Sequence, residues 1–373
     1  MRVILTHPYC WPYVRRGSER VMEDWSLYLL SKGYEVVTLA GRPADLAPDA
    51  DPPHKVLRPI HWRPWMGRLR VQTTHCFFFT VLKSLEALRP DVVHSCFLYD
   101  SLAATLLKRK RRFRTILQMN GVPVPGVSAH RFWPPESWLV KEAIRRADHR
   151  IVCSAFVGEL VRQHYSADSH VILPPLNFAR WTEWEYPRAD PPVVLGIADF
   201  NERRKGIRVL VKAFAVLKRE MPEVRLRLSG YLTDALRMQV LNSVPPRVRT
   251  DIEVLGIGQV QDIPRLYYEA SVTALASMWE PSGTVMMESW ACGTPVVATR
   301  HGGLPEYFAN GVGYLFDPKT EDQETNNAEG LAEALYQGIQ LSRCMGIRER
   351  CRTHARQFSA EVLGPKIESL YRQ

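Results

Sequence analysis

Short apolar segments alternate with amphipathic stretches along almost the whole chain, and this alternation limits the possible folds. In the first half, the strand-like segments are 2–6, 35–39, 91–94, 115–118, 149–153 and 170–173. Between the first two, the stretch 19–32 repeats apolar residues at helical spacing and ends at Gly33. Short apolar strands alternating with helices are typical of a parallel sheet covered on both faces. The first half therefore predicts a doubly wound α/β domain.

A segment rich in proline and tryptophan, 174–192, interrupts this pattern and is expected to be a linker. The alternation then restarts with strand-like segments at 193–196, 225–230, 253–256, 272–276 and 295–298 and a helix at 207–220. From Glu329 the chain is expected to be helical to its end, with an interruption near Phe358 and Ser359. The length of 373 residues fits two domains at roughly 150 residues each.

This pattern predicts two doubly wound Rossmann-like α/β domains facing each other across a cleft. We expect the domains to comprise residues 1–180 and 181–358, and a C-terminal helix at 359–373 to pack back on the first domain. Ligands of open α/β sheets bind beyond the carboxyl ends of the strands.

Charge is unevenly distributed between the two halves. The net charge is +10, and residues 1–185 contain 26 Lys and Arg against 17 Asp and Glu, so nearly all of the excess lies there. Eight of the ten tryptophans lie in the same half. This asymmetry predicts two units with different partners.

The densest basic run is 108–114, between an apolar helical stretch and a strand-like segment. Such a run is typical of a solvated helix end, where cations suit the C-terminal dipole. Contact with an anionic membrane surface or an anionic substrate stays open as an alternative. No nucleic-acid-binding module accompanies the run, so we expect no nucleic acid partner.

Composition also excludes several classes of protein. No stretch approaches the ~18–20 apolar residues of a membrane-spanning helix, and the N-terminal residues predict a first strand rather than a signal peptide. The seven cysteines are odd in number and scattered, which argues against a disulfide framework or a zinc site. We therefore expect a cytoplasmic protein, with peripheral contact at the inner face of the membrane left open.

The densest chemical signal lies in residues 279–298. This stretch follows a strand-like segment, so Glu280 is expected in a strand-to-helix loop. Ser282 is a candidate N-cap of a helix from about 283 to 292, and Gly283 lets the backbone approach a ligand closely. The free amides of Gly283, Thr284 and Val285 would then form a helix N-terminus suited to phosphate.

Glu288 follows Glu280 after seven intervening residues, one turn inside the expected helix. A carboxylate there can accept two hydrogen bonds from a ribose diol. Taken alone, the same residues favour two surface glutamates and a serine that only caps a helix.

The segment strongly resembles the family 4 retaining glycosyltransferases of the GT-B fold. Their signature is two glutamates separated by seven residues, followed by a run that 291–298 matches as Ala-Cys-Gly-Thr-Pro-Val-Val-Ala. Further matches, in order, are the Gly-Ser-Glu loop near 17–19, the basic turn 203–206, the helix near 264–267, the loop 302–306 and the segment 311–318. The resemblance thus extends over most of the chain.

Individual roles follow from this resemblance. Glu288 resembles the glutamate that binds ribose, and Glu280 resembles the glutamate near the donor sugar hydroxyls. Lys205, with Arg204, resembles the basic residues that neutralise the diphosphate. Gly17 resembles the N-terminal loop glycine whose amide approaches the phosphate. The family needs no metal in this role, so we expect neither a metal nor a cofactor besides the nucleotide-diphosphate sugar that serves as donor.

The chain departs from the family pattern at two places. Asp199 stands where the family usually has an arginine, and Arg203 or Arg204 is the candidate replacement. Asn120 stands where a histidine near the reaction centre is common, and an amide cannot act as an acid or base at neutral pH. Asn120 is still our candidate for that position, because in the family's front-face view the leaving phosphate takes the acceptor proton.

Other polar and aromatic residues carry weaker signals. Asp49 and Asp51 have the Asp-x-Asp form of a metal site, but their proline-rich surroundings indicate an exposed turn. Three histidines are expected at strand ends, where contact with an acceptor and simple packing are both open: His7, His94 and His301. Trp62, Trp65, Trp133 and Trp138 lie in loop-like segments, where core packing is the default and stacking on a sugar is the alternative.

We expect a retaining, metal-independent glycosyltransferase that moves a hexosyl residue from a nucleotide-diphosphate sugar to an acceptor hydroxyl. UDP is favoured over GDP on frequency of use alone. The acceptor is a glycan, a lipid-linked glycan or a natural product, and the basic first half favours an anionic or membrane-associated one. Two alternatives remain: a nucleotide-sugar epimerase of similar fold and a non-catalytic carbohydrate-binding protein.

Overall fold

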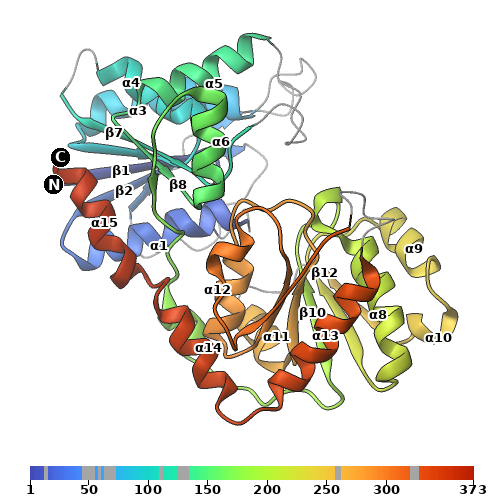
Figure 1. The fold of residues 1–373 in the computed structure, drawn as a ribbon. Coiled ribbons are helices and arrows are strands. Elements are labelled where there is room, and N and C mark those ends of the chain that lie inside the picture. The colour runs from blue at the N-terminus through green and yellow to red at the C-terminus, as the bar shows by residue number, and fades with distance from the viewer. Residues whose placement is uncertain are drawn as a thin grey trace. The chain divides into compact units, whose positions relative to one another are not determined.

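A computed structural model of the chain describes residues 1–11, 16–43, 55–57, 60–62, 73–108, 112–123, 134–256, 262–319 and 327–373. Figure 1 shows the fold. The chain divides into two compact units. The N-terminal unit comprises residues 1–175 together with 360–373, and the C-terminal unit comprises residues 176–359.

The N-terminal unit is built on a parallel sheet. Its seven strands follow the order β4-β2-β1-β6-β7-β8-β9, and a short pair, β3 with β5, lies apart from it. The strands are β1 Arg2–His7, β2 Glu35–Ala40, β3 Arg42–Pro43, β4 Lys55–Leu57, β5 Ile60–Trp62, β6 Val92–Ser95, β7 Arg114–Met119, β8 His149–Val152 and β9 His170–Val171.

Helices cover both faces of this sheet. They are α1 Gly17–Ser31, α3 Thr73–Leu88, α4 Leu98–Lys108, α5 Pro134–Arg146, α6 Ala155–Tyr165 and α15 Ala360–Arg372. In β1, Val3 and Leu5 pack with α1 and α15, whereas Ile4 packs with α3 and α4 on the opposite face. This alternation follows from the two-residue period of a strand. The C-terminal helix α15 lies beside α1, as Figure 1 shows.

The C-terminal unit repeats the arrangement with a six-stranded parallel sheet. Its strands follow the order β12-β11-β10-β13-β14-β15. They are β10 Val193–Ile197, β11 Arg225–Ser229, β12 Ile252–Gly256, β13 Val272–Leu275, β14 Val296–Thr299 and β15 Gly313–Phe316.

Two groups of helices enclose the second sheet. The helices are α7 Phe178–Thr182, α8 Ile207–Glu220, α9 Asp234–Asn242, α10 Pro246–Arg249, α11 Ile263–Glu269, α12 Thr284–Ala291, α13 Ala328–Ser342 and α14 Ile347–Arg356, with short 3-10 turns η1 Arg203–Lys205 and η3 Leu304–Tyr307. Val297 of β14 joins the core under α8 and α13, and its neighbours Val296 and Ala298 are buried on the other face, which α12 contacts.

Both sheets have a point where the strand order reverses. In the N-terminal unit, β1 lies between β2 and β6, and in the C-terminal unit β10 lies between β11 and β13. Adjacent connections leave such a point in opposite directions and open a crevice at the carboxyl ends of the strands. The carboxyl ends of β10 and β13 are therefore the first place to look for a site.

The predicted fold class is confirmed, with local differences. The strand-like segments of both halves form strands of the two sheets, and the helix predicted at 207–220 is α8 with the same bounds. The strand β15 was missed, because Gly-Tyr-Leu-Phe is short and flanked by glycine and Asp-Pro. The C-terminal helical region has an additional break at Gly346, which has a positive φ of 76°.

The segment 174–192, predicted to be the linker, contains the boundary between the two units after Pro175, and the rest of it belongs to the C-terminal unit. It contains α7, and Trp181 in that helix is buried. The Tyr268 hydroxyl donates to the Trp181 carbonyl at 3.0 Å, and the Arg188 guanidinium donates to the Ala270 carbonyl at 3.0 Å and the Gly293 carbonyl at 3.0 Å. A large apolar side chain and an arginine that finds backbone acceptors thus fix this segment to the C-terminal unit.

Several residues singled out from the sequence lie outside the described ranges. These are Asp49 and Asp51, Trp65, Trp133 and the basic residues 109–111. None of the helices in the described part of the chain combines the length and the hydropathy of a membrane-spanning segment. In the same part of the chain, no group of three His, Cys, Asp or Glu side chains is arranged to hold a metal ion.

Candidate functional site

A pocket opens at the point where the strand order of the C-terminal sheet reverses. It holds about 420 Å³ of empty space, part of which is open solvent. Residues from the ends of β10 and β13, the turn η1 and the start of α12 line it: Ile197, Ala198, Phe200, Lys205, Leu210, Ala274, Leu275, Ala276, Ser277, Glu280, Ser282, Gly283, Thr284 and Val285. With Leu210 of α8, the fold thus gathers residues from five separate segments at one sheet edge.

At this pocket the Glu280 carboxylate pairs with two cations. Its Oε2 atom lies 2.8 Å from Lys205 Nζ and 2.9 Å from Arg204 Nη1. The side chains of Glu280 and Lys205 are only 12% and 19% exposed, so the pair is largely shielded from solvent. Burial alone would raise the pKa of the Glu280 carboxyl, but Lys205 and Arg204 outweigh it and hold that pKa below its usual value.

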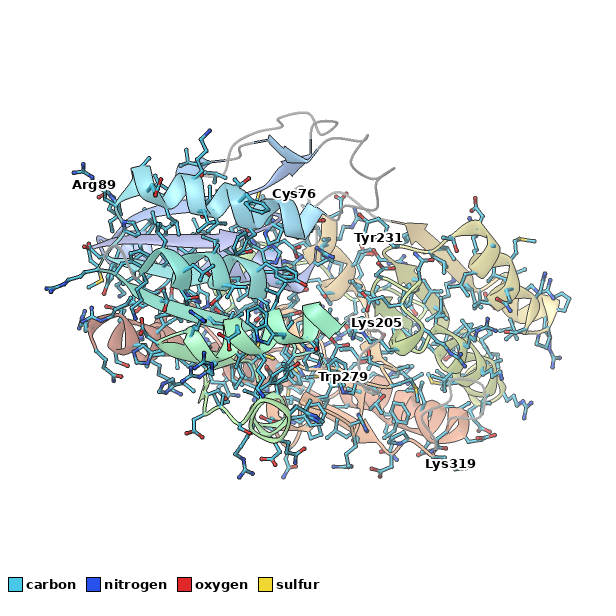
Figure 2. All side chains as sticks on the ribbon, turned by 90° about the horizontal axis from the view of Figure 1, so that it is seen from above. Cys76, Arg89, Lys205, Tyr231, Trp279 and Lys319 are labelled. Carbon is cyan, nitrogen blue, oxygen red and sulfur yellow. The ribbon has the colours of Figure 1, made fainter. Side chains whose placement is uncertain are left out.

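The turn that carries both cations is attached to the loop before α12. The Met278 amide donates to the Arg204 carbonyl at 2.7 Å, and Arg204 Nη1 donates to the Trp279 carbonyl at 3.1 Å. Gly206 ends the turn at φ 68°, and a Cβ at that position would lie 1.9 Å from the Ala276 carbonyl oxygen. Only glycine permits this close approach. Figure 2 labels Lys205 and Trp279 of this region.

The helix α12 begins one residue later than the sequence predicts. Gly283 is the N-cap, with no side-chain capping bond, so the prediction that Ser282 caps the helix is wrong. The physical reason is the position of the first intrahelical bonds, which run from the Met286 and Met287 amides to the Gly283 carbonyl at 2.9 and 3.2 Å. Ser282 instead lines the pocket, with Thr284 and Val285 in the first turn.

The second glutamate, Glu288, is almost fully buried one turn further along α12, with an exposed fraction of 3%. Its Oε2 atom accepts a hydrogen bond of 2.7 Å from the Tyr267 hydroxyl of α11. Glu288 is therefore not a surface residue, although it does not line the pocket described above. Sequence reasoning missed the role of Tyr267, because its partner lies 21 residues away on another helix.

Asp199, which replaces the arginine usual in the family, closes a local turn. Its Oδ1 atom accepts from the Asn201 amide at 3.1 Å and from Asn201 Nδ2 at 3.2 Å. Arg204 reaches the Glu280 carboxylate, and it also pairs with Glu202. Arg203 precedes Arg204 in the same turn and is exposed.

Gly17 and Asn120 belong to the N-terminal unit. Gly17 is the first residue of α1. Asn120 follows β7, and its Oδ1 atom accepts from Gln118 Nε2 at 3.1 Å. Gln118 in turn accepts from Trp25 Nε1 at 3.0 Å. The amide of Asn120 is thus held by a short chain of polar contacts at the carboxyl end of β7.

Two candidate histidines of this unit are buried. His7 ends β1, and its Nδ1 atom lies 3.9 Å from the fully buried Glu19 carboxylate, to which Arg16 Nη2 donates at 2.7 Å. His94 Nδ1 lies 2.8 Å from the Tyr371 hydroxyl of α15. Burial lowers the pKa of His94 to about 4, so this ring is neutral at pH 7.

The geometry of the C-terminal pocket suits an anionic ligand. The cations Lys205 and Arg204 lie at one side. The first turn of α12 adds backbone amides that come before the first intrahelical hydrogen bonds, together with the positive end of the helix dipole. Among the described residues, Glu280 is the carboxylate that pairs with both cations, and Glu202 pairs with Arg204 as well.

Comparisons with known proteins agree with this arrangement. The family model "Glycosyl transferases group 1" matches residues 182–357, and the model "Glycosyltransferase Family 4" matches residues 15–180. The chain belongs to the family 4 glycosyltransferases. The first model spans the pocket of the C-terminal unit, and the second spans most of the N-terminal unit.

This glycosyltransferase is similar along most of its length to characterised relatives. It is 25% identical to a glycogen synthase of Mycobacterium tuberculosis over 351 residues, which cover 83% of this chain and 81% of the relative. Among solved structures it resembles sucrose-phosphate synthase from Thermosynechococcus elongatus, with a TM-score of 0.80 at 21% identity over 100% of this chain and 98% of that one. It also resembles Anabaena HepE in complex with UDP, with a TM-score of 0.72 at 18% identity over the whole of both chains. The predicted GT-B fold is thereby confirmed.

Proposed function

We propose that this glycosyltransferase moves a hexosyl residue from a nucleoside-diphosphate sugar to an acceptor hydroxyl with retention of anomeric configuration. The observation that carries the proposal is the pocket at the strand reversal of the C-terminal sheet, where Lys205, Glu280 and the start of α12 meet. A sugar donor has an anionic diphosphate and a hydroxyl-rich sugar. The pocket offers cations and backbone amides to the diphosphate and a carboxylate to the sugar hydroxyls.

In the proposed site, Lys205 acts on the leaving group. As the bond between the sugar C1 atom and the phosphate oxygen breaks, negative charge accumulates on the diphosphate. The Lys205 ammonium and the amides of Gly283, Thr284 and Val285 stabilise that charge from fixed positions. The new bond forms between C1 and the acceptor oxygen on the same face, and the acceptor proton passes to the released phosphate oxygen. This step requires no protein base, which is consistent with Asn120 in place of a histidine.

The cations of the turn η1 supply the charge compensation that a metal ion provides in other transferases. We therefore propose a metal-independent reaction. Arg204 holds Glu280 and the Trp279 carbonyl, so its proposed contribution is to position the carboxylate rather than to bind phosphate alone. Glu288 is the proposed ribose ligand, and Gly17 the proposed contribution of the N-terminal unit to phosphate binding.

The donor nucleotide is proposed to be UDP. The support is the likeness to Anabaena HepE in its complex with UDP, together with the frequency of UDP among donors of this kind. The acceptor is proposed to be an anionic or membrane-associated glycan or glycolipid, because the excess charge lies in residues 1–185. A cytoplasmic location at the membrane surface is proposed on the same ground.

The proposal is tested in two steps with the whole chain. A thermal-denaturation panel of UDP-, GDP- and ADP-sugars identifies the donor, because a ligand at ~100 times its Kd adds ~2.7 kcal/mol to the free energy of unfolding. Proton NMR of the reaction with that donor, an acceptor mixture and EDTA then reports the anomeric configuration of the product. An α-donor that yields an α-product supports retention without a metal. A β-product, or complete loss of transfer in EDTA, contradicts it.

A further inference from the structure

The contact between Glu280 and the two cations raises a problem for donor binding. One oxygen, Oε2, accepts from both Lys205 at 2.8 Å and Arg204 at 2.9 Å. These are the distances at which a lysine or arginine binds a phosphate oxygen. The carboxylate therefore occupies the position that the proposed function gives to the donor diphosphate.

The diphosphate and the carboxylate cannot share these cations at low cost. Both are anionic, and the pocket wall that they would share is largely shielded from solvent, since Glu280 is 12% exposed and Lys205 is 19% exposed. Like charges held a few Å apart in such surroundings disfavour each other strongly. Diphosphate binding thus requires the carboxylate to leave at least Lys205.

Within Glu280, only the side chain can move away from Lys205, because the backbone is held in place. Its carbonyl accepts from the Gly303 amide at 2.9 Å, and Gly302 approaches so closely at φ 64° that a Cβ there would lie 2.4 Å from that carbonyl oxygen. The backbone is thus fixed by the turn 302–303. A carboxylate that rotates away from Lys205 stays in the pocket, where it needs new hydrogen-bond donors.

A donor sugar places hydroxyl donors beyond the diphosphate, and a bare nucleoside diphosphate has none there. We propose that Glu280 acts as a specificity residue through exchange of partners: in the empty site it holds Lys205 and Arg204, and on donor binding the diphosphate takes the cations while sugar hydroxyls take the carboxylate. Binding of a bare nucleoside diphosphate also separates Glu280 from Lys205, but no hydrogen bonds to sugar hydroxyls offset the free energy that this separation costs. The site thereby discriminates against its own nucleotide product. This inference rests on the proposed function and adds to it the reason for the ion pair.

The test is a set of binding titrations on the whole chain, with Glu280→Gln as the variant. Glutamine keeps the size of the side chain and removes its charge. Glu202→Gln is the matched control, because it removes the same charge from another carboxylate that pairs with Arg204 but has no contact with Lys205 among those described. The probes are inorganic pyrophosphate, UDP and UDP-glucose, and thermal denaturation checks that both variants are folded.

We expect Glu280→Gln to bind pyrophosphate and UDP about tenfold more tightly than the wild type, a change of about 1.4 kcal/mol. UDP-glucose should gain less or bind more weakly, so that the preference for UDP-glucose over UDP falls about tenfold or more. Glu202→Gln should change each Kd less than about threefold.

Unchanged or weaker binding of pyrophosphate by Glu280→Gln overturns the inference, as does equal tightening in the Glu202→Gln control. Failure of pyrophosphate to bind either protein overturns it as well. If pyrophosphate behaves as expected but the wild type transfers no sugar from any donor, the proposed function fails while the exchange of partners stands. If the wild type transfers sugar and the pyrophosphate affinities are equal, the exchange fails alone.

Discussion

Glu280 and Glu288 have the same side chain and opposite surroundings. Glu280 faces two cations at a pocket, whereas Glu288 is buried deeper and accepts a hydrogen bond from the neutral Tyr267 hydroxyl. These surroundings suit different tasks. Glu280 can give up its cations to a charged ligand, whereas Glu288 is held in place to recognise neutral hydroxyls.

If Glu288 binds the ribose, Glu288→Gln weakens nucleotide binding and leaves pyrophosphate binding unchanged. Hydrogen bonds to a charged acceptor are worth about 1.5–3 kcal/mol against about 1 kcal/mol for a neutral one, so we expect the Kd of UDP to rise about tenfold. Glutamine can still accept from Tyr267, so the fold should persist. Titrations with both ligands measure this, and equal weakening of both would point to a purely structural glutamate.

His94 predicts a pH dependence in the N-terminal unit. Burial lowers its pKa to about 4 from an unperturbed value of 6.5. Between these two pH values, His94 binds a proton in the unfolded chain but not in the folded one. Stability is therefore full above pH 6.5 and falls towards pH 4, by up to about 3 kcal/mol for this group. The Tyr371 hydroxyl and Gln118 are the neighbours that face the ring.

The variant His94→Asn keeps a polar atom near the Nδ1 position and removes the titration. We expect a flatter dependence of the unfolding free energy on pH between 4 and 6.5 than in the wild type, measured by urea unfolding at several pH values. If the unfolding free energies of the two proteins depend on pH in the same way, another group causes the loss of stability.

The spacing of the two glutamates and the resemblance to the family were enough to single out Glu280, Glu288 and Lys205. The bond between Lys205 and Glu280 could not be predicted, because it joins residues 75 positions apart and depends on side-chain rotamers. The roles of these residues in binding and catalysis stay predictions until they are measured.

Among the elements, the turn η1 depends on a single glycine. Gly206 has a positive φ and leaves no room for a Cβ against the Ala276 carbonyl. Because this turn carries Lys205, a shift of the turn moves the proposed diphosphate ligand as well.

We expect Gly206→Ala to lower the free energy of unfolding by more than the ~1–2 kcal/mol that a left-handed conformation costs an alanine, and to reduce transfer at least tenfold through displacement of Lys205. Gly346→Ala is the matched control, with φ 76° and no atom within 4 Å of the added Cβ. Thermal denaturation and a transfer assay of both variants measure the difference. Equal stability and activity in the two would contradict the close approach at Gly206.

The elements whose identity could be predicted are those with a clear period. The helix α8 has apolar residues at helical spacing, and its bounds agree with the structure. Packing decided the rest: Trp181 turned an apparent linker into part of the C-terminal unit, and a glycine cap moved the start of α12 by one residue. Neither a buried tryptophan nor a cap geometry can be recognised from proline content or serine position alone.

For the whole molecule, the repeated alternation of strands and helices predicted both sheets. The return of α15 to the N-terminal unit depends on contacts remote in sequence, such as those of the Glu368 carboxylate, which accepts from the Tyr28 hydroxyl at 2.6 Å and the Tyr34 hydroxyl at 2.8 Å. We expected the C-terminal helix to pack on the first domain, and α15 belongs to the N-terminal unit. The individual contacts could not be predicted, because they join residues 340 and 334 positions apart.

Part of the basic excess of the N-terminal half has a structural use. In the run 108–114, Lys108 pairs with Asp148, and Arg114 donates to the Tyr371 and Arg372 carbonyls of α15. The remaining excess charge still predicts salt-sensitive recognition of an anionic acceptor, because exposed charges are screened within about 8–10 Å at 0.1–0.15 M salt.

We expect the acceptor KM to rise at least about fivefold between 50 and 300 mM NaCl, and the donor KM to change less than about twofold, because Lys205 is largely shielded from screening. Steady-state kinetics in both substrates test this at fixed pH. If neither KM changes with salt concentration, the charge of the N-terminal half does not indicate the kind of acceptor.

The assignment of the donor site is tested by comparing sugar transfer by Lys205→Ala with that by the wild type, using the donor that the denaturation panel selects. Loss of a preorganised charge at the leaving group costs about 2.7–4 kcal/mol in comparable sites, so kcat should fall by a factor of about 100 to 1,000 while the variant stays folded. A Lys205→Ala enzyme that transfers sugar at the wild-type rate would contradict the assignment of the pocket as the donor site.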